Sequence, residues 1–338
     1  MRKSFFILFA FAFSIVCGNN ARAQGYDIKE RFYDGIVSSR VVKKQSDFNL
    51  KGKVKSCTED SPQLNQRLSL SFDPAGLLLK KQVETLEQNG KIKQVTAYTF
   101  TGNKLKSVKF EDAAASYTSQ KIFDLSGYLE KEIMQVNDPG KKYYREADYT
   151  YNSTFDDLKI AYTYNLNLDN RDVVLSDAYT FTFNDKHQLI KERNESKHKE
   201  TTYGSTANII YDLAGNITAV TFMDDCALSG GNSCANLALT VKYDNRNNII
   251  FKSMSDQTVR NAGWSDSYTY SATYNEHNDV ISTSGSSGNP SFRTAIKPEA
   301  SVVKYEYEYD SEGNWIKKYE LAGDKRTFSC SRNIEYYD

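Results

Sequence analysis

A short turn motif recurs nine times along this 338-residue chain and dominates what it can fold into. Most copies start with an aromatic residue and Asp or Asn, pass through Gly or Asn, and end on an aliphatic residue or Trp, as in FDPAGL at 72–77. The copies begin at Phe72, Phe100, Phe123, Tyr151, Phe183, Tyr211, Tyr243, Tyr274 and Tyr309. Repeats at such spacings indicate an array of small units. Each interval is too short for a βαβ unit and fits two strands with two turns.

One backbone requirement explains the residue near the end of each turn. An Asp or Asn first, Pro tolerated second and Gly fourth is typical of a type I turn whose last residue is left-handed. The fourth position holds Gly76, Gly127, Gly215, Gly313, Asn247, Asn278 and His187. These are residue types that tolerate a positive φ. The copies starting at Phe100 and Tyr151 depart from this length, so their hairpins are less clearly predicted.

The segments between the turns alternate as strands do. In residues 303–309, VKYEYEY, the Tyr side chains share one face and the charged side chains share the other. Asn89-Gly90 supplies a hairpin turn at the opposite end. The prediction is an all-β fold, a long antiparallel β-hairpin meander of about eighteen strands. Open sheets rarely exceed about 10 strands, so we expect this one to curl around its aromatic side into a barrel-like shell or spiral.

The first 23 residues read as a signal peptide. Arg2 and Lys3 precede a short apolar run, and Ala21-Arg22-Ala23 offers a cleavage site before Gln24. Lipidation at Cys17 is the lesser alternative, because Val16 is a poor fit before it. We therefore expect export, to the periplasm or beyond, with a lead segment at 24–52 and the repeat domain at 53–338.

The net charge and the distribution of aromatic residues indicate which classes of partner to expect. Removing residues 1–23 leaves 40 basic residues against 43 acidic ones, so neither nucleic acid nor an anionic membrane is suggested. We expect no transmembrane span in the mature chain. A sheet crossing an outer membrane would confine its aromatic residues to two girdles. Here Tyr runs along whole strands, which does not favour that alternative.

Four cysteines remain after cleavage and are disulfide candidates in an exported chain. Cys226 and Cys234 bracket a Gly-rich loop, and a bridge closing this hairpin end is the simplest interpretation. Cys57 and Cys330 lie on the first and last expected strands; a bond between them would require the sheet to close. However, Cys57 alternates with two lysines, which argues against a position in an apolar core.

The sequence offers no catalytic, cofactor or metal site. His187, His198 and His277 lack partners at triad or metal-ligand spacing. No nucleophile elbow, phosphate loop or zinc-protease motif occurs. Carboxylates are numerous, and a glycoside hydrolase needs only two of them. The loop pairs Asp156-Asp157 and Asp224-Asp225 leave weak calcium binding as a lesser alternative, although the sequence does not supply the several oxygen ligands that calcium requires.

The turn motif resembles the YD repeat of RHS and teneurin proteins. The resemblance rests on YDLAGNI at 211–217 and YDSEGNWI at 309–316. LKGKVKS at 50–56 and RNIEYY at 332–337 are similar to exported YD-repeat-type proteins common in Bacteroidetes. The resemblance to YD-repeat proteins covers about residues 50–338 and implies a hairpin array. In the large relatives such repeats build a β shell that encloses a polypeptide or displays adhesive surfaces.

Two functions from different classes follow as expectations. The first is a non-catalytic exported repeat protein, a binding or scaffolding module for a cell-surface polymer or protein partner. The alternative is a carbohydrate-active hydrolase that uses loop carboxylates. The Tyr rows suit sugar stacking, but cross-strand packing explains them as well. A protein that protects another polypeptide is a third possibility, by analogy with RHS shells alone.

Overall fold

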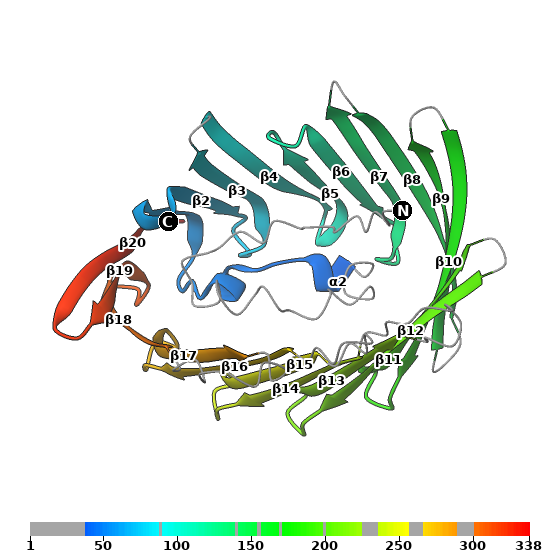
Figure 1. Ribbon diagram of the computed structural model, residues 1–338. Helices are drawn as coiled ribbons and strands as arrows, with labels where there is room; N and C mark the ends of the chain where they lie inside the picture. The colour runs from blue at the N-terminus through cyan, green and yellow to red at the C-terminus, as the bar shows by residue number, and fades with distance from the viewer. Residues whose placement is uncertain are drawn as a thin grey trace.

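The computed structural model describes residues 38–87, 90–138, 141–153, 157–168, 171–198, 201–224, 236–256, 266–288 and 301–338. It is an all-β, antiparallel fold (Figure 1). The short helices are α2 (Ser38–Val41), η2 (Gln45–Phe48) and η3 (Pro62–Leu64). The strands are β1 (Val54–Ser61), β2 (Gln66–Phe72), β3 (Leu78–Glu87), β4 (Gly90–Thr101), β5 (Lys104–Asp112), β6 (Tyr117–Phe123), β7 (Leu129–Asp138), β8 (Lys141–Ser153), β9 (Asp157–Leu168), β10 (Arg171–Phe183), β11 (Leu189–His198), β12 (Thr201–Tyr211), β13 (Ile217–Asp224), β14 (Asn236–Tyr243), β15 (Ile249–Asp256), β16 (Asp266–Tyr274), β17 (Val280–Gly288), β18 (Ser301–Tyr309), β19 (Trp315–Ala322) and β20 (Lys325–Tyr336). No helix among the described residues has the length and apolarity needed to cross a membrane.

The strands form one sheet that returns to its own beginning. Each described strand pairs antiparallel with the next one in the chain, and β1 also pairs with β20, where Cys57 lies opposite Ile334 and Asp60 opposite Ser331. All twenty strands therefore have a neighbour on both sides. Closure removes the exposed edges that invite aggregation. The predicted curled meander is confirmed, with β1 and β20 added to the strands that flank the nine turns.

The repeated turns behave as predicted. The seven residues in the fourth turn position all have positive φ, including 55° at His187, 63° at Asn247 and 78° at Gly313. The shorter copy at Phe100 is a tight hairpin in which Phe100 lies opposite Leu105. In the copy starting at Tyr151, residues 154–156 lie outside the described part of the chain. All these turns join an even-numbered strand to the next odd-numbered one, so they share one end of the ring.

The strand register shifts beside these turns. At the β12–β13 turn, for example, Tyr211 lies opposite Ile217, while Ile210 lies opposite Ala219. Such bulges bend the strand and increase its twist. Their repetition from turn to turn helps the long sheet to curve into a ring instead of remaining open.

Residues 38–53 form a strap that crosses the inside of the ring (Figure 1). Its backbone is bonded to the β2–β3 turn, where Gln45 N donates to Gly76 O and Leu78 N donates to Lys43 O, both at 2.9 Å. Val41 packs against the largest apolar cluster of the inner wall. The strap thereby links strands on different sides of the ring.

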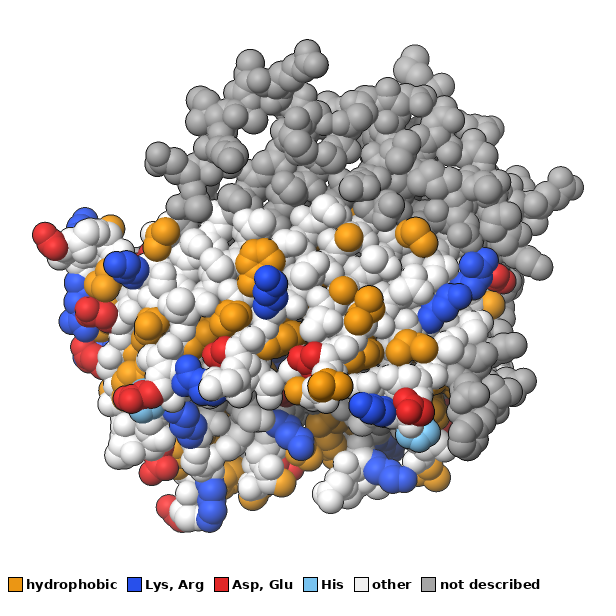
Figure 2. Space-filling view, turned by 90° about the horizontal axis from the view of Figure 1, so that it is seen from below, with side chains coloured by type: hydrophobic (Ala, Val, Ile, Leu, Met, Phe, Trp, Pro, Cys, Tyr) orange, Lys and Arg blue, Asp and Glu red, His pale blue; other side chains and the backbone are white. Residues whose placement is uncertain are grey.

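The core lies on the inner face of the sheet. Two clusters contain most of it, one around Phe123, Leu129 and Phe181 and the other around Phe72 and Val54. On the outer face, charged side chains form ion pairs, Lys109 with Glu111 along β5, and Lys317 with Glu308 and Arg326 with Glu306 between strands, and they remain about half exposed. Figure 2 shows hydrophobic side chains scattered among polar and charged ones over the described surface of one wall. Alternation along the strands thus separates the two faces, as the sequence predicts.

Cys57 is buried, contrary to the expectation from its lysine neighbours. The β1–β20 register shifts between Val54 and Ser56, and this irregularity turns Cys57 inward. Burial raises the pKa of its thiol to about 11, although the Arg332 charge opposes the shift.

The structure does not form the candidate Cys57–Cys330 disulfide. Both cysteines are buried on neighbouring strands, and neither is part of a disulfide. Cys57 lies opposite Ile334, four residues from Cys330, and four residues of strand span roughly 13 Å. A disulfide requires Cα atoms within about 7 Å. The other candidates, Cys226 and Cys234, lie outside the described residues.

Candidate functional site

The Asp or Asn that follows the aromatic residue accepts backbone N–H groups of its own turn, as Asn184 and Asn275 show for the Asn type. Asp212 Oδ1 accepts the N–H of Asn216 at 2.8 Å, and Asp244 Oδ1 accepts the N–H groups of Arg246 and Asn248 at 2.8 and 2.9 Å. The backbone N–H of Asn216 is the main reason that the pKa of Asp212 lies below its ordinary range. For Asp244, burial alone would raise the pKa, but the hydrogen bonds from Asn248 and Arg246 outweigh it and the pKa is lowered. Both carboxylates are therefore structural.

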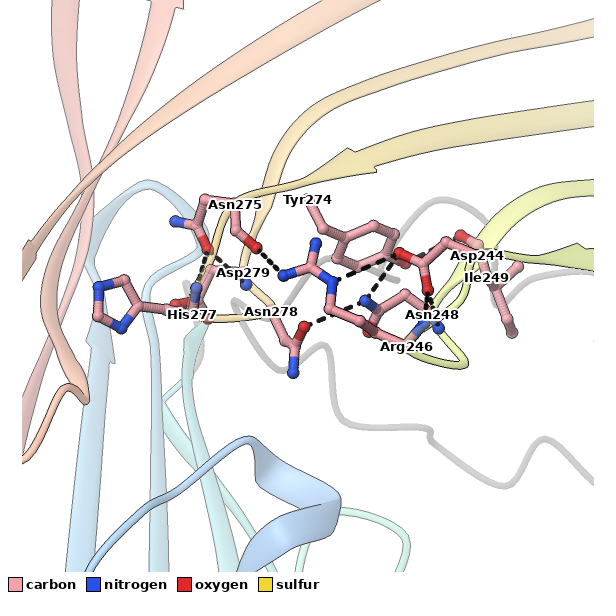
Figure 3. A network of polar contacts seen from close by, with 9 residues as sticks. All are labelled: Asp244, Arg246, Asn248, Ile249, Tyr274, Asn275, His277, Asn278 and Asp279. Atoms are coloured by element: carbon pink, nitrogen blue, oxygen red, sulfur yellow. Dashed lines mark hydrogen bonds and ion pairs between the residues drawn. The ribbon is translucent and has the colours of Figure 1, made fainter.

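Neighbouring turns are joined side chain to side chain (Figure 3). Asn248 Nδ2 donates to Asn278 Oδ1 at 3.2 Å, and Asn216 Nδ2 donates in the same way to Asn247 Oδ1 at 3.0 Å. Arg246 reaches across to the carbonyl oxygen of Asn275 at 2.7 Å. This row of carboxamides, which we call the turn ladder, gives a role to the Asn that follows the left-handed residue.

The Tyr that opens a repeat connects it to the preceding one. Tyr274 Oη donates to the carbonyl oxygen of Ile249 at 2.9 Å, and Tyr243 donates to that of Ile217 at 2.8 Å. In each case the acceptor is the first strand residue after the preceding turn. A Phe in this position packs in the core but cannot make the bond. This link was not among the predictions from sequence, although the later repeats carry its signal in their preference for Tyr over Phe.

Replacing Tyr274 by Phe is expected to lower the free energy of unfolding by about 1 kcal/mol, the usual value of one such bond. Burial raises the pKa of Tyr274 to about 12, and the nearby Asp244 charge adds to this. Because the unfolded Tyr ionises at lower pH, its contribution to stability is lost as the pH rises from about 10 to 12. Urea denaturation at pH 8 and pH 11 measures both effects. Tyr144 serves as the control, because it is exposed and donates its hydroxyl to Glu146 and not to a neighbouring turn. An equal loss in Tyr144→Phe would contradict the assignment.

The end of the strap is bonded to two of the turns. Lys51 N donates to Asn314 Oδ1 at 2.7 Å, and Asn314 Nδ2 returns a bond to Lys51 O at 2.9 Å. Asn49 Nδ2 donates to Asp279 Oδ1 at 2.7 Å, and Tyr309 Oη donates to Asp279 Oδ2 at 3.0 Å. Burial raises the pKa of Asp279, and these two bonds oppose the rise. The strap therefore covers one end of the inner wall.

A buried ion pair lies where the sheet closes. Arg332 Nε on β20 donates to Glu59 Oε2 on β1 at 2.9 Å, and the guanidinium lies 3.7 Å from the ring centre of Trp315. Nearby, the ammonium of Lys318 lies over the Tyr305 ring at 4.0 Å. The ion pair joins the first strand to the last, and the two ring contacts join β20 to β19 and β19 to β18.

An open hollow of about 570 Å³ lies at the rim opposite the nine turns. It is lined by Lys80, Val95, Glu111, Asp112, Ala113, Ser116, Tyr117 and Thr118, from β3 to β6 and the β5–β6 turn. Ser116 has a φ of 49°, a conformation that is uncommon for a residue other than Gly. An ammonium, two carboxylates, hydroxyl groups and one aromatic ring thus line this hollow. Such a mixture suits a polar organic ligand.

The hollow is better equipped for binding than for catalysis. Asp112 Oδ1 accepts the N–H groups of Ala114 and Ala115, and its Oδ2 accepts from Gln94 Nε2 at 2.8 Å. Glu111 is paired with Lys109 at 2.7 Å. Both acids therefore already have structural partners.

The structure does not bring the other sequence candidates together. His187 occupies its left-handed turn position, His277 lies in the β16–β17 turn, and His198 ends β11. Asp157 begins β9 and Asp224 ends β13, while their partners Asp156 and Asp225 lie outside the described residues. Within the described part of the chain, no three His, Cys, Asp or Glu side chains are grouped to hold a metal ion.

Comparison with known proteins gives structural likenesses of low score. No family model matches the chain, and no curated protein matches it. A porin-like protein from Bacteroides uniformis aligns with a TM-score of 0.37 and 15% identity, over 65% of this chain and 96% of that one. A porin-like protein from Bacteroides vulgatus aligns with a TM-score of 0.30 and 11% identity, over 84% and 98%. A chain of a TcdB2-TccC3-TEV structure aligns with a TM-score of 0.16 and 11% identity, over 78% and 20%.

Proposed function

We propose that this chain is a non-catalytic, exported binding or scaffolding module of the YD-repeat type, acting on a cell-surface polymer or protein partner. The observation that carries the proposal is the hollow beside the β5–β6 turn, where Tyr117, Ser116, Thr118 and Lys80 face one open space. A glycan is the preferred ligand, because sugars combine hydroxyl groups with an apolar ring face.

The test is binding to the purified full chain. A glycan array and a pull-down from cell-envelope extract are expected to give at least one saturable ligand. Tyr117→Ala is expected to weaken that binding by roughly ten-fold or more, the size of effect given by an aromatic anchor. Tyr144→Ala, on β8 and exposed, is the matched control and should bind as the parent does. Blank results in both assays, or equal binding by both variants, would reject the proposal.

A carbohydrate-active hydrolase is the second candidate, because Glu111 and Asp112 line the same hollow. It predicts cleavage of a bound oligosaccharide, visible as shortened products by mass spectrometry. Glu111→Gln should abolish that cleavage, whereas replacing its neighbour Lys109 by Gln should not. If an oligosaccharide that demonstrably binds the chain remains intact after prolonged incubation, the hydrolase is rejected and only the binding function remains.

A further inference from the structure

Lys51 of the strap and His277 of the β16–β17 turn make a contact that depends on protonation. Lys51 Nζ lies 3.3 Å from His277 Nδ1 and donates to the carbonyl oxygen of Gly313 at 2.9 Å. An ammonium group can only donate. Nδ1 of His277 is therefore the acceptor, which makes the ring neutral with its proton on Nε2. That nitrogen faces Glu276 Oε1 at 3.6 Å.

The other groups around His277 are an aromatic face and carboxylates, both of which attract positive charge. The ring of Tyr309 stacks on the imidazole at 4.2 Å and 25°, and an aromatic face attracts a cation. Glu276 adds a carboxylate from the same turn, and Asp279 is held behind Tyr309. Across Lys51, Glu312 of the next turn lies beside Gly52. About a third of the His277 side chain is exposed, so water protons reach it.

We propose that His277 is a proton-sensitive latch for the strap. Protonation of Nδ1 replaces an acceptor by a donor and sets two positive charges side by side. Because the His277 ring is stacked on Tyr309 whereas the Lys51 side chain is long and flexible, Lys51 is the partner that withdraws. Imidazole ordinarily changes charge between pH 5 and 8. Mild acid thus loosens the end of the strap from the β18–β19 turn and weakens the cover over this end of the inner wall.

Hydrogen exchange measured by mass spectrometry on the full chain tests the latch. The reporters are the amides of Lys51, bonded to Asn314 Oδ1, and Leu50, bonded to Gln45 O. After correction for intrinsic rates, their protection is expected to fall roughly ten-fold from pH 7.5 to pH 5.5. His277→Asn should remove this response to pH.

A matched variant separates the latch from a general effect of acid. His187→Asn changes a histidine in an equivalent turn to the residue that other repeats carry there, and it should respond as the parent does. Lys51→Met retains His277 and removes the ammonium, so its exchange should not respond to pH either. If His277→Asn does not fold, the Lys51→Met variant alone tests whether the contact between Lys51 and His277 causes the acid response. An acid response that survives in Lys51→Met, or none in the parent chain, overturns the proposal.

Discussion

Replacing Glu59 by Gln is expected to lower the free energy of unfolding by about 3–5 kcal/mol, the usual cost of breaking a buried ion pair on one side. The Arg332 and Glu59 side chains are 4% and 2% exposed, and their atoms Nε and Oε2 lie 2.9 Å apart. The substitution leaves a buried guanidinium without its carboxylate at the junction of β1 and β20. Urea denaturation of the full chain measures the loss.

The adjacent residue provides the control. Asp60 pairs with Arg67 at 2.6 Å, but these side chains are 44% and 54% exposed. Asp60→Asn should therefore cost less than about 1 kcal/mol. The double replacement Glu59→Leu with Arg332→Met is expected to recover much of the loss, because no charge is then left buried. Equal losses in Glu59→Gln and Asp60→Asn would contradict a buried, structural pair.

Phe72→Ala is expected to cost about 3–5 kcal/mol, as deletion of a buried aromatic side chain usually does. Phe72 is 1% exposed and packs edge to face against Phe48 of the strap, with ring centres 5.9 Å apart. The change opens a cavity in the wall and removes a contact of the strap. Thermal and urea unfolding should show the same loss. Leu213, 98% exposed in a turn, is the control, and Leu213→Ala should change stability by less than about 0.5 kcal/mol.

A double-mutant cycle isolates the strap contact. Combining Phe72→Ala with Phe48→Ala should reveal a coupling of about 0.5–1.5 kcal/mol between the two rings. Strict additivity of the two losses would mean that the strap does not rest on this part of the wall.

The turns were predictable because their chemistry is local. The left-handed backbone at Gly313, Asn247 and His187 follows from one steric rule applied within five residues of sequence. The alternation of Tyr and charged residues on β18 likewise fixes which face is buried. The predicted sheet, its curvature and the two-faced strands therefore followed from pattern alone.

Contacts between distant segments could not be predicted in this way. The strap has no repeat pattern, and its bonds to Asn314 span 263 residues. The bulge that turns Cys57 inward depends on the register with β20, which a single strand does not encode. The hollow at the rim could not be predicted either, because Lys80 and Tyr117 line the same space only after four strands have paired. Of these contacts, only the links made by Tyr243 and Tyr274, and the same bond from Tyr211 to the carbonyl oxygen of Leu189, left a signal in the sequence, as a preference for Tyr over Phe.

The closing pair of strands is tested most directly by disulfide trapping. Thr58 lies opposite Ser69 on β2 and opposite Asn333 on β20. In a chain with Cys57 and Cys330 replaced by Ala, the pairs Thr58→Cys/Ser69→Cys and Thr58→Cys/Asn333→Cys are oxidised and mapped as peptides by mass spectrometry. If β1 pairs with both β2 and β20, both cysteine pairs form their cross-link in comparable yield. A cross-link from Thr58→Cys to Ser69→Cys with none to Asn333→Cys would show that the sheet does not close.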